Sequence, residues 1–257
     1  MNISSERFDK IANQYLTSEV HQMSETMKLA HEISIDWDIK NLCDVACGAG
    51  HFGLSFRNIT DNITAVDPSK NMLNISKKAA EEKGITTYRI INSFAEELDL
   101  DNDKFDLVIS RLAPHHFTNI QKSIDEMFRI TKPSGHVIVI DLAGYIDPDI
   151  DNFNHRLEIL HDPTHVKSYN SNEWITFFEE SNFNNIRIFE NQCESKSGVS
   201  VERWCQIANS GIHAEEEIRK LLRNAPKEYL EVMQIRERDN EFYFPIKTNM
   251  IVAEKSC

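Results

Sequence analysis

Three glycines stand close together in the segment DVACGAGHFG, which runs from Asp44 to Gly53. Gly48, Gly50 and Gly53 fit the pattern G-x-G-x-x-G, and Asp67 follows 19 residues after the first of them. A turn without side chains lets a ligand lie against backbone N–H groups, and a carboxylate at the next strand end accepts hydrogen bonds from both hydroxyls of a ribose. The spacing therefore predicts a site for a ribose-bearing nucleotide.

Asp44 indicates which nucleotide is bound. In a dinucleotide fold the residue four places before the first glycine is usually apolar, because a carboxylate there would repel the pyrophosphate. The ammonium and sulfonium of S-adenosylmethionine are instead favoured by a nearby carboxylate. The pattern favours S-adenosylmethionine, while an NAD(P)-dependent oxidoreductase and a nucleotide-binding module without catalytic activity stay open as alternatives.

An α/β fold is needed to position these residues. Short apolar runs alternate with helical periodicity, which is typical of β/α units on a largely parallel sheet. The expected strands are 41–46, 63–66, 87–91, 105–110, 135–142, 185–190 and 248–253, with a further β-like segment at 241–244. The segment 145–169 has no convincing period and is expected to be a long loop or insertion, whereas 192–231 is expected to be helical.

Charge and composition exclude several classes of protein. The 257 residues include 28 Lys and Arg against 41 Asp and Glu, a net charge of -13 without a basic patch, which disfavours nucleic acid as a partner. No apolar run approaches the ~20 residues of a membrane span, and the N-terminus is too polar for a secretion signal, so a cytoplasmic location is expected. Five scattered cysteines lack zinc-ligand or disulfide spacing, so no metal site is expected and Cys43 and Cys47 are predicted to be buried packing residues.

Three segments together point to a family. DVACGAG (with Ala46 in place of a first glycine), AVDPSKNML and AEELDLDNDKFDLVISRLAPHHF resemble successive motifs of the class I S-adenosylmethionine-dependent methyltransferases. Within that class the resemblance is to the small-molecule branch related to ubiquinone and menaquinone biosynthesis methyltransferases, and it covers nearly the whole chain. It implies transfer of the methyl group of S-adenosylmethionine to a small-molecule acceptor, with S-adenosylhomocysteine as product.

The resemblance also implies a fold. It is a Rossmann-like, seven-stranded, mostly parallel sheet with helices on both faces, an antiparallel last strand and helical lid insertions. We expect a single methyltransferase domain over 1–257, since large α/β units reach this length. Its expected parts are an N-terminal helical cap (1–36), a cofactor-binding half (37–142) and a substrate-side half (143–257) with insertions at 145–170 and 192–231.

Ten residues are implied as cofactor contacts by the resemblance: Asp44, Ala46, Gly48, Gly50, Asp67, Pro68, Met72, Phe94, Ala95 and Arg111. Asp67 would bind the ribose diol and Met72 would pack on the adenine. Phe94 stands where many members have an acid that bonds the adenine amino group, so adenine binding is expected to depend on stacking and on backbone groups near Ala95. Arg111 would pair with the cofactor's carboxylate or offer its backbone carbonyl to the ammonium.

Histidines are the candidates for proton transfer. His115 and His116 follow the fourth strand at its carboxyl end, where ligands bind in open α/β sheets, and His165 lies in the 145–170 insertion. Methyl transfer mainly requires positioning, but a hydroxyl, amine or carbon acid acceptor would benefit from a base near neutral pKa. Tyr15 and His21, near the N-terminus, are expected to roof the pocket and contact the substrate. Ordinary packing is the alternative for each of these five, and no motif identifies the acceptor or the oligomeric state.

Overall fold

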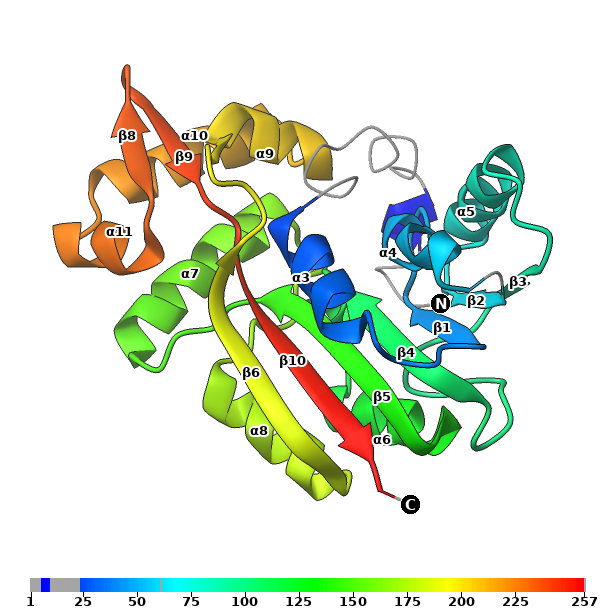
Figure 1. Ribbon diagram of the computed structural model, residues 1–257. Coiled ribbons are helices and arrows are strands. Elements are labelled where there is room, and N and C mark those ends of the chain that lie inside the picture. The colour runs from blue at the N-terminus through cyan, green and yellow to red at the C-terminus, as the bar shows by residue number, and fades with distance from the viewer. Residues whose placement is uncertain (1–5, 10–23, 61, 257) are drawn as a thin grey trace.

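The computed structural model describes residues 6–9, 24–60 and 62–256. Its centre is a seven-stranded sheet with the order β3-β2-β1-β4-β5-β10-β6 (Figure 1). The strands of this sheet are β1 (Leu42–Val45), β2 (Ile63–Val66), β3 (Tyr88–Ile91), β4 (Phe105–Arg111), β5 (Thr131–Leu142), β6 (Phe183–Cys193) and β10 (Lys247–Lys255). Only β10 runs antiparallel to its neighbours, β5 and β6, which confirms the predicted sheet.

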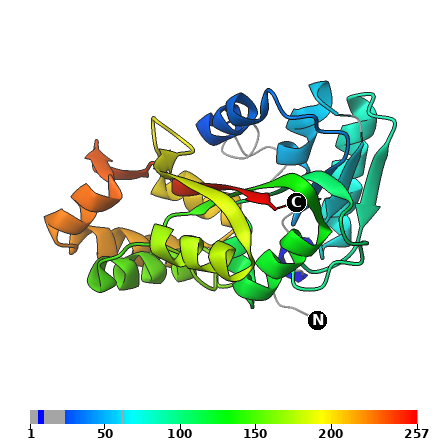
Figure 2. The same cartoon turned by 60° about the horizontal axis from the view of Figure 1, so that its bottom comes forward.

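Helices cover both faces of the sheet (Figure 2). One face carries α3 (Glu25–Ser34), α4 (His51–Ser55) and α5 (Lys70–Glu82), and the other carries α6 (Ile120–Ile130) and α8 (Ser171–Glu180). In β4, Leu107 and Ile109 pack toward the first group of helices, whereas Val108 between them packs toward the second. Because both faces are buried, the central strands are apolar at successive positions.

A third apolar core lies outside the sheet. It joins α7 (Pro148–His161), α9 (Val201–Ala208), α10 (Ile212–Arg223) and α11 (Lys227–Met233) to a small sheet of β7 (Val199–Ser200), β9 (Glu241–Phe244) and β8 (Arg236–Arg238). We call this group, residues 148–161 and 199–244, the outer unit. Figure 1 shows it gathered to one side of the main sheet. The β-like segment 241–244 is therefore a strand, but in this second sheet.

The prediction of a loop over 145–169 is wrong at residues 148–161, which form α7. Asp147 caps α7 by accepting hydrogen bonds from the amides of Asp149 (2.9 Å) and Ile150 (3.2 Å), and proline at the first helical position suits such a start. The buried face of the helix includes Ile150, Phe153 and Leu157, at a helical spacing. The polar residues between them had hidden this period.

The prediction of helix over 192–231 is also wrong at its start, because helix begins only at Val201. Pairing of Lys247 with Cys193 extends β6 to Cys193, and helix begins only at Val201, after Ser200 caps it. Cys43 and Cys47 are buried with free thiols, as the strand pattern predicted. No helix in the described ranges is long and apolar enough to cross a membrane. The division of the chain at residues 36 and 142 stays a prediction.

Candidate active site

The glycine loop turns sharply as it leaves the carboxyl end of β1. Ala46, Gly48 and Gly50 all have left-handed backbone conformations, with φ angles of 55°, 53° and 82°. A Cβ on Gly48 would meet no atom within 4 Å, so this glycine faces open space. A Cβ on Gly50 would come within 2.8 Å of the Ser76 Cβ, so this glycine allows α4 to approach α5. The two glycines thus have different tasks: one faces a space where a ligand fits, and the other allows close packing.

Two carboxyl groups hold this loop. The Asp44 Oδ2 accepts a hydrogen bond from the Gly53 amide (2.9 Å), and the Asp67 Oδ2 accepts one from the Gly48 amide (2.9 Å). The other Asp67 oxygen accepts from the Ser69 amide (2.8 Å). Burial raises the pKa of Asp44 to about 7 and that of Asp67 to about 6. A ligand that brings a donor or a positive charge would favour the ionised form of both groups.

The loop borders a cavity at the carboxyl ends of β1, β2 and β4, with about 930 Å³ of empty space including the part open to solvent. Nine of the ten predicted cofactor contacts line it: Asp44, Ala46, Gly48, Asp67, Pro68, Met72, Phe94, Ala95 and Arg111. Gly50 does not, since its place is at the start of α4. Four separate segments of the sequence therefore converge on one small-molecule-sized space.

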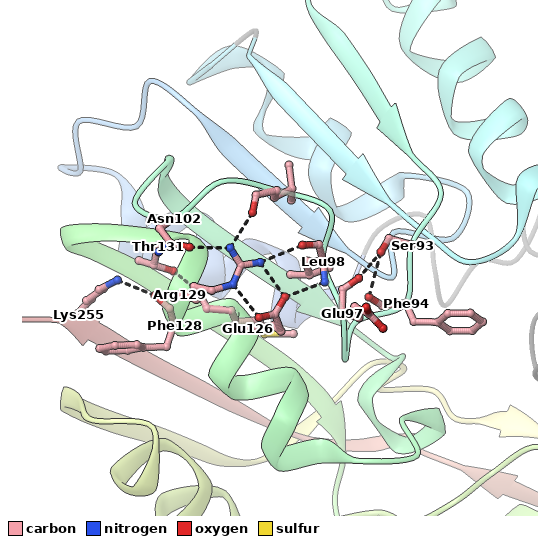
Figure 3. A network of polar contacts seen from close by, with 12 residues as sticks. Ser93, Phe94, Glu97, Leu98, Asn102, Glu126, Phe128, Arg129, Thr131 and Lys255 are labelled. Atoms are coloured by element: carbon pink, nitrogen blue, oxygen red, sulfur yellow. Dashed lines mark hydrogen bonds and ion pairs between the residues drawn. The ribbon is translucent and has the colours of Figure 1, made fainter.

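A polar network fixes the loop that carries Phe94 and Ala95 (Figure 3). The Leu98 amide donates to the Glu126 carboxylate (2.7 Å), and Arg129 donates to the carbonyl of Leu98 (2.9 Å) and to Glu126 itself (2.7 Å). Both charged residues belong to α6, whose apolar face is buried against the sheet, so the loop is tied to the core. The side chain of Phe94 is 39% exposed beside the cavity and leaves an aromatic face there.

Arg111 lines the same cavity, but its guanidinium is already engaged. It donates to Glu194 (2.7 Å) and to the Ser24 hydroxyl (3.1 Å), and both members of the ion pair are buried. The first of the two roles expected for Arg111, pairing with a cofactor carboxylate, would require this pair to break. The expected role of its backbone carbonyl requires no such change.

His116 stands at the boundary of a second cavity. It belongs to a 3₁₀ turn, η2 (Pro114–His116), that follows β4. Its Nδ1 donates to the carbonyl of Thr164 (3.0 Å), and Phe8 packs edge-on against the ring with the centroids 5.0 Å apart. Burial, with a contribution from His115, lowers the pKa of His116 to about 3. The ring is therefore neutral at physiological pH.

His115 and His165 lie in the second cavity and not in the first. The His115 Nδ1 is 2.6 Å from the Asp141 Oδ1, and both groups are buried. Burial alone would lower the pKa of His115, but the Asp141 carboxylate raises it above its usual value. Burial lowers the pKa of His165 to about 2. The three predicted histidines are thus close together but electrostatically different.

Comparison with known proteins agrees with this geometry. A family model described as "Methyltransferase domain" matches residues 43–139. The chain is 29% identical over 219 residues to the methyltransferase YcgJ of Bacillus subtilis (strain 168), which covers 82% of this chain and 87% of YcgJ. The crystal structure of YcgJ matches with a TM-score of 0.83 at 25% identity over 90% of this chain and 98% of that one.

A demethylmenaquinone methyltransferase of Oceanobacillus iheyensis is 28% identical over 140 residues, 51% of this chain and 58% of that protein. The chain belongs to the class I S-adenosylmethionine-dependent methyltransferases. In this methyltransferase, the acidic loop, the second motif and the segment after β4 all line the first cavity, and the segment after β4 also lines the second.

The start of the methyltransferase chain also contacts both cavities. Tyr15 and His21, predicted to bind substrate, lie outside the described residues. Of residues 6–9, Phe8 lines the first cavity and Arg7 forms an ion pair with Asp162 (3.0 Å), which lines the second. Asp9 accepts a hydrogen bond from the Asn71 amide (3.2 Å) at the start of α5. This short segment therefore spans the two cavities.

Sequence reasoning missed four acidic and histidine side chains of the methyltransferase: Asp141, Glu158, His161 and Asp162. Glu158 and His161 are three residues apart on α7, so they share a face of the helix. Glu158, His161 and Asp162 were missed because their segment was expected to be a loop, whereas Asp141 lies on β5. Among the described residues, no three His, Cys, Asp or Glu side chains are arranged to hold a metal ion.

Proposed function

We propose that this methyltransferase binds S-adenosylmethionine in the first cavity and transfers its methyl group to a small-molecule acceptor. One observation carries the proposal: nine residues from four sequence segments line a single cavity at the carboxyl edge of the sheet. S-adenosylmethionine fits this cavity because the space beside the Gly48 Cα is open and because the Asp44 and Asp67 carboxyls line the same cavity. When bound, S-adenosylmethionine supplies an activated methyl group that a nucleophile displaces in line.

Each part of the cavity suits one part of this ligand. Asp67 lies at the end of β2 and accepts hydrogen bonds, so its carboxylate can receive the ribose hydroxyls. Phe94, on the loop held by Arg129, and Met72, on α5, offer apolar contact to the adenine. Asp44 supplies negative charge near the amino acid end, where the ligand carries an ammonium.

A small acceptor is favoured over a macromolecule by the surroundings of the cavity. The net charge of -13 opposes nucleic acid, and α7 and α9 of the outer unit enclose the adjoining space. A relative of this chain is named a demethylmenaquinone methyltransferase, which acts on a small molecule. The oxidoreductase alternative has only the glycine pattern in its favour.

Calorimetric titration tests the proposal. We expect the protein to bind S-adenosylhomocysteine but not NADH, and we expect Asp67→Ala to weaken the binding at least tenfold. Asp99→Ala, on the exposed loop before β4, is the matched control and should bind as the unaltered chain does. Binding of NADH alone, or of neither ligand, would overturn the proposal.

A further inference from the structure

The second cavity adjoins the first, and Leu112 and His116 line both. Its apolar wall is formed by Leu142, Val199, Trp204, Ile207 and Ile246. Its polar wall comes from the turn after β4, from α7 and from the loop that follows α7. A molecule in this cavity would therefore touch an apolar surface on one side and a group of histidines and carboxyls on the other.

Among the histidines of this cavity, a carboxylate orients His115. Asp141, on β5, is fully buried, and its Oδ1 accepts from the His115 Nδ1 over 2.6 Å. The second oxygen, Oδ2, is buried without a hydrogen-bond partner among the described residues. Since Nδ1 donates to the carboxylate, the neutral ring carries its lone pair on Nε2. The pair has the arrangement that holds an imidazole ready to accept a proton.

His165 shows that this cavity is built for a polar ligand. Its side chain is 5% exposed, and neither ring nitrogen has a hydrogen-bond partner in the described part of the chain. The loop that carries it is held in place, because the Val166 amide donates to the carbonyl of His115 (2.8 Å). Buried polar atoms without partners are uncommon and call for a ligand or water. His165 is therefore suited to hydrogen bonding, and because burial lowers its pKa to about 2 it is a poor base.

The charges in the cavity indicate the sign of the ligand. Asp141 is paired with His115 and Asp162 with Arg7. The carboxyl of Glu158 lines the cavity, and within the described ranges no ion pair or side-chain hydrogen bond to it is formed. Burial raises its pKa to about 7. An anion would meet the carboxyl groups of Glu158 and Asp162, which line the cavity, whereas a cation would pair with the Glu158 carboxyl.

We propose that the second cavity binds the methyl acceptor, that this acceptor is an amine on an apolar body, and that His115, oriented by Asp141, accepts its proton. This inference rests on the proposed function. The ammonium pairs with Glu158, and one N–H proton passes to the His115 Nε2. The freed nitrogen lone pair forms the N–CH₃ bond as the C–S bond breaks and the sulfur keeps that electron pair. The products are a methylated ammonium and S-adenosylhomocysteine, and His115 returns its proton to solvent.

Three probes of one size test the class of ligand. Protein saturated with S-adenosylhomocysteine is titrated with benzylamine, p-cresol or benzoate and followed by protein NMR. We expect benzylamine to bind and to shift resonances of the cavity residues. We expect Glu158→Gln to lower the affinity for benzylamine at least tenfold. Glu216→Gln, on the exposed side of α10, is the matched control and should not change binding.

The outcomes separate this inference from the proposed function. If S-adenosylhomocysteine itself does not bind, the proposed function fails. If it binds but benzylamine does not, or if p-cresol or benzoate binds as well as benzylamine, the amine assignment fails and the proposed function stands. Equal binding of benzylamine by Glu158→Gln and the unaltered chain would also overturn it.

A second pair of variants tests the base. His115→Asn keeps a donor toward Asp141 but cannot accept a proton, and we expect it to reduce methylation of benzylamine at least 100-fold without weakening S-adenosylhomocysteine binding. Asp141→Asn should lower the pH at which the ring nitrogens of His115 titrate in ¹⁵N NMR. The other groups around His115 stay in place in that variant: Glu158 and His161 from α7, Asp162 directly after it, His116 beside His115 and His165 from the following loop. An unchanged titration would show that Asp141 does not tune the ring.

Discussion

The guanidinium of Arg111, at the end of β4, donates to the carboxylate of Glu194, just beyond β6, over 2.7 Å. The other oxygen of Glu194 accepts from the hydroxyls of Thr26 (2.7 Å) and Thr248 (3.2 Å). One buried carboxylate therefore joins α3, β4 and β10 directly beside the first cavity. The stability of this region depends on charges that the chain buries together.

Glu194→Gln should be strongly destabilising. The substitution keeps the size of the side chain but leaves the buried charge of Arg111 without its partner, which typically costs about 3–5 kcal/mol. Urea unfolding at pH 7 measures the loss. Glu25→Gln removes ion pairs to Lys28 and Lys196 at the surface of α3 and should not shift the midpoint measurably. Equal midpoints for the two variants would contradict this account.

Gly50→Ala should weaken cofactor binding although Gly50 does not line the cavity. The left-handed φ alone costs an alanine about 1–2 kcal/mol, and contact of the new Cβ with Ser76 adds about 1–3 kcal/mol and shifts the loop. Gly84→Ala is the control, because Gly84 has a similar φ of 73° but open space around it. Thermal unfolding and titration with S-adenosylhomocysteine measure both variants, and only Gly50→Ala should lose affinity. A normal affinity in Gly50→Ala would show that the loop tolerates the added methyl group.

The affinity for S-adenosylhomocysteine should fall as the pH is lowered through about 6. Burial raises the pKa of Asp67 to about 6 in the free protein, and ribose donors favour the ionised form, so binding releases a proton. Below that pH the dissociation constant should rise toward about tenfold per pH unit. Calorimetry from pH 5 to 8 measures this slope. Asp67→Asn should bind weakly and with a smaller pH dependence, and an unchanged slope would assign the proton to another group.

His165→Asn should become relatively more stable as the pH falls. Burial lowers the pKa of His165 to about 2 in the folded chain, whereas an unfolded histidine titrates near 6.5. The neutral ring therefore stabilises the fold fully above about pH 6.5 and loses this contribution below it. Relative to that of the variant, the free energy of unfolding of the unaltered chain should fall by about 1.4 kcal/mol per pH unit as the pH is lowered from about 6 to 5.

Unfolding in urea at several pH values gives this difference. His213→Asn, at an exposed position on α10, serves as the control and should unfold with the same pH dependence as the unaltered chain. A parallel pH dependence in His165→Asn would mean that the ring is charged or accessible to water in the folded state.

The fold and the first cavity could be predicted because their signals are local. The glycines, Asp44 and Asp67 lie next to strands that are recognisable from their apolar runs, and parallel strands bring their carboxyl ends to one edge. The second cavity could not be predicted in this way. Its central contact joins His115 to Asp141 across two neighbouring strands, and no spacing in the sequence specifies that pair.

The missed helix had a different cause. In α7 the apolar residues Ile150, Phe153 and Leu157 follow a helical period, but aspartates, asparagines and histidines stand between them. The residues they pack against lie in the second segment of the outer unit, which begins about 40 residues later at Val199. Amphipathic helices whose apolar partners are distant in sequence give weak signals, and here that weakness also hid Glu158 and His161.

The position of β10 has a consequence for synthesis of the chain. Residues 247–255 pair with β5 on one side and β6 on the other, so β6 has no neighbour in the main sheet until this segment has left the ribosome. The strands β1 to β5, which carry the glycine loop, are made earlier and can pair with one another. During translation the open edge of β5 is exposed while the outer unit is being made, and such edges are prone to aggregation. The last strand of the sheet to be synthesised is therefore the one that joins its two parts.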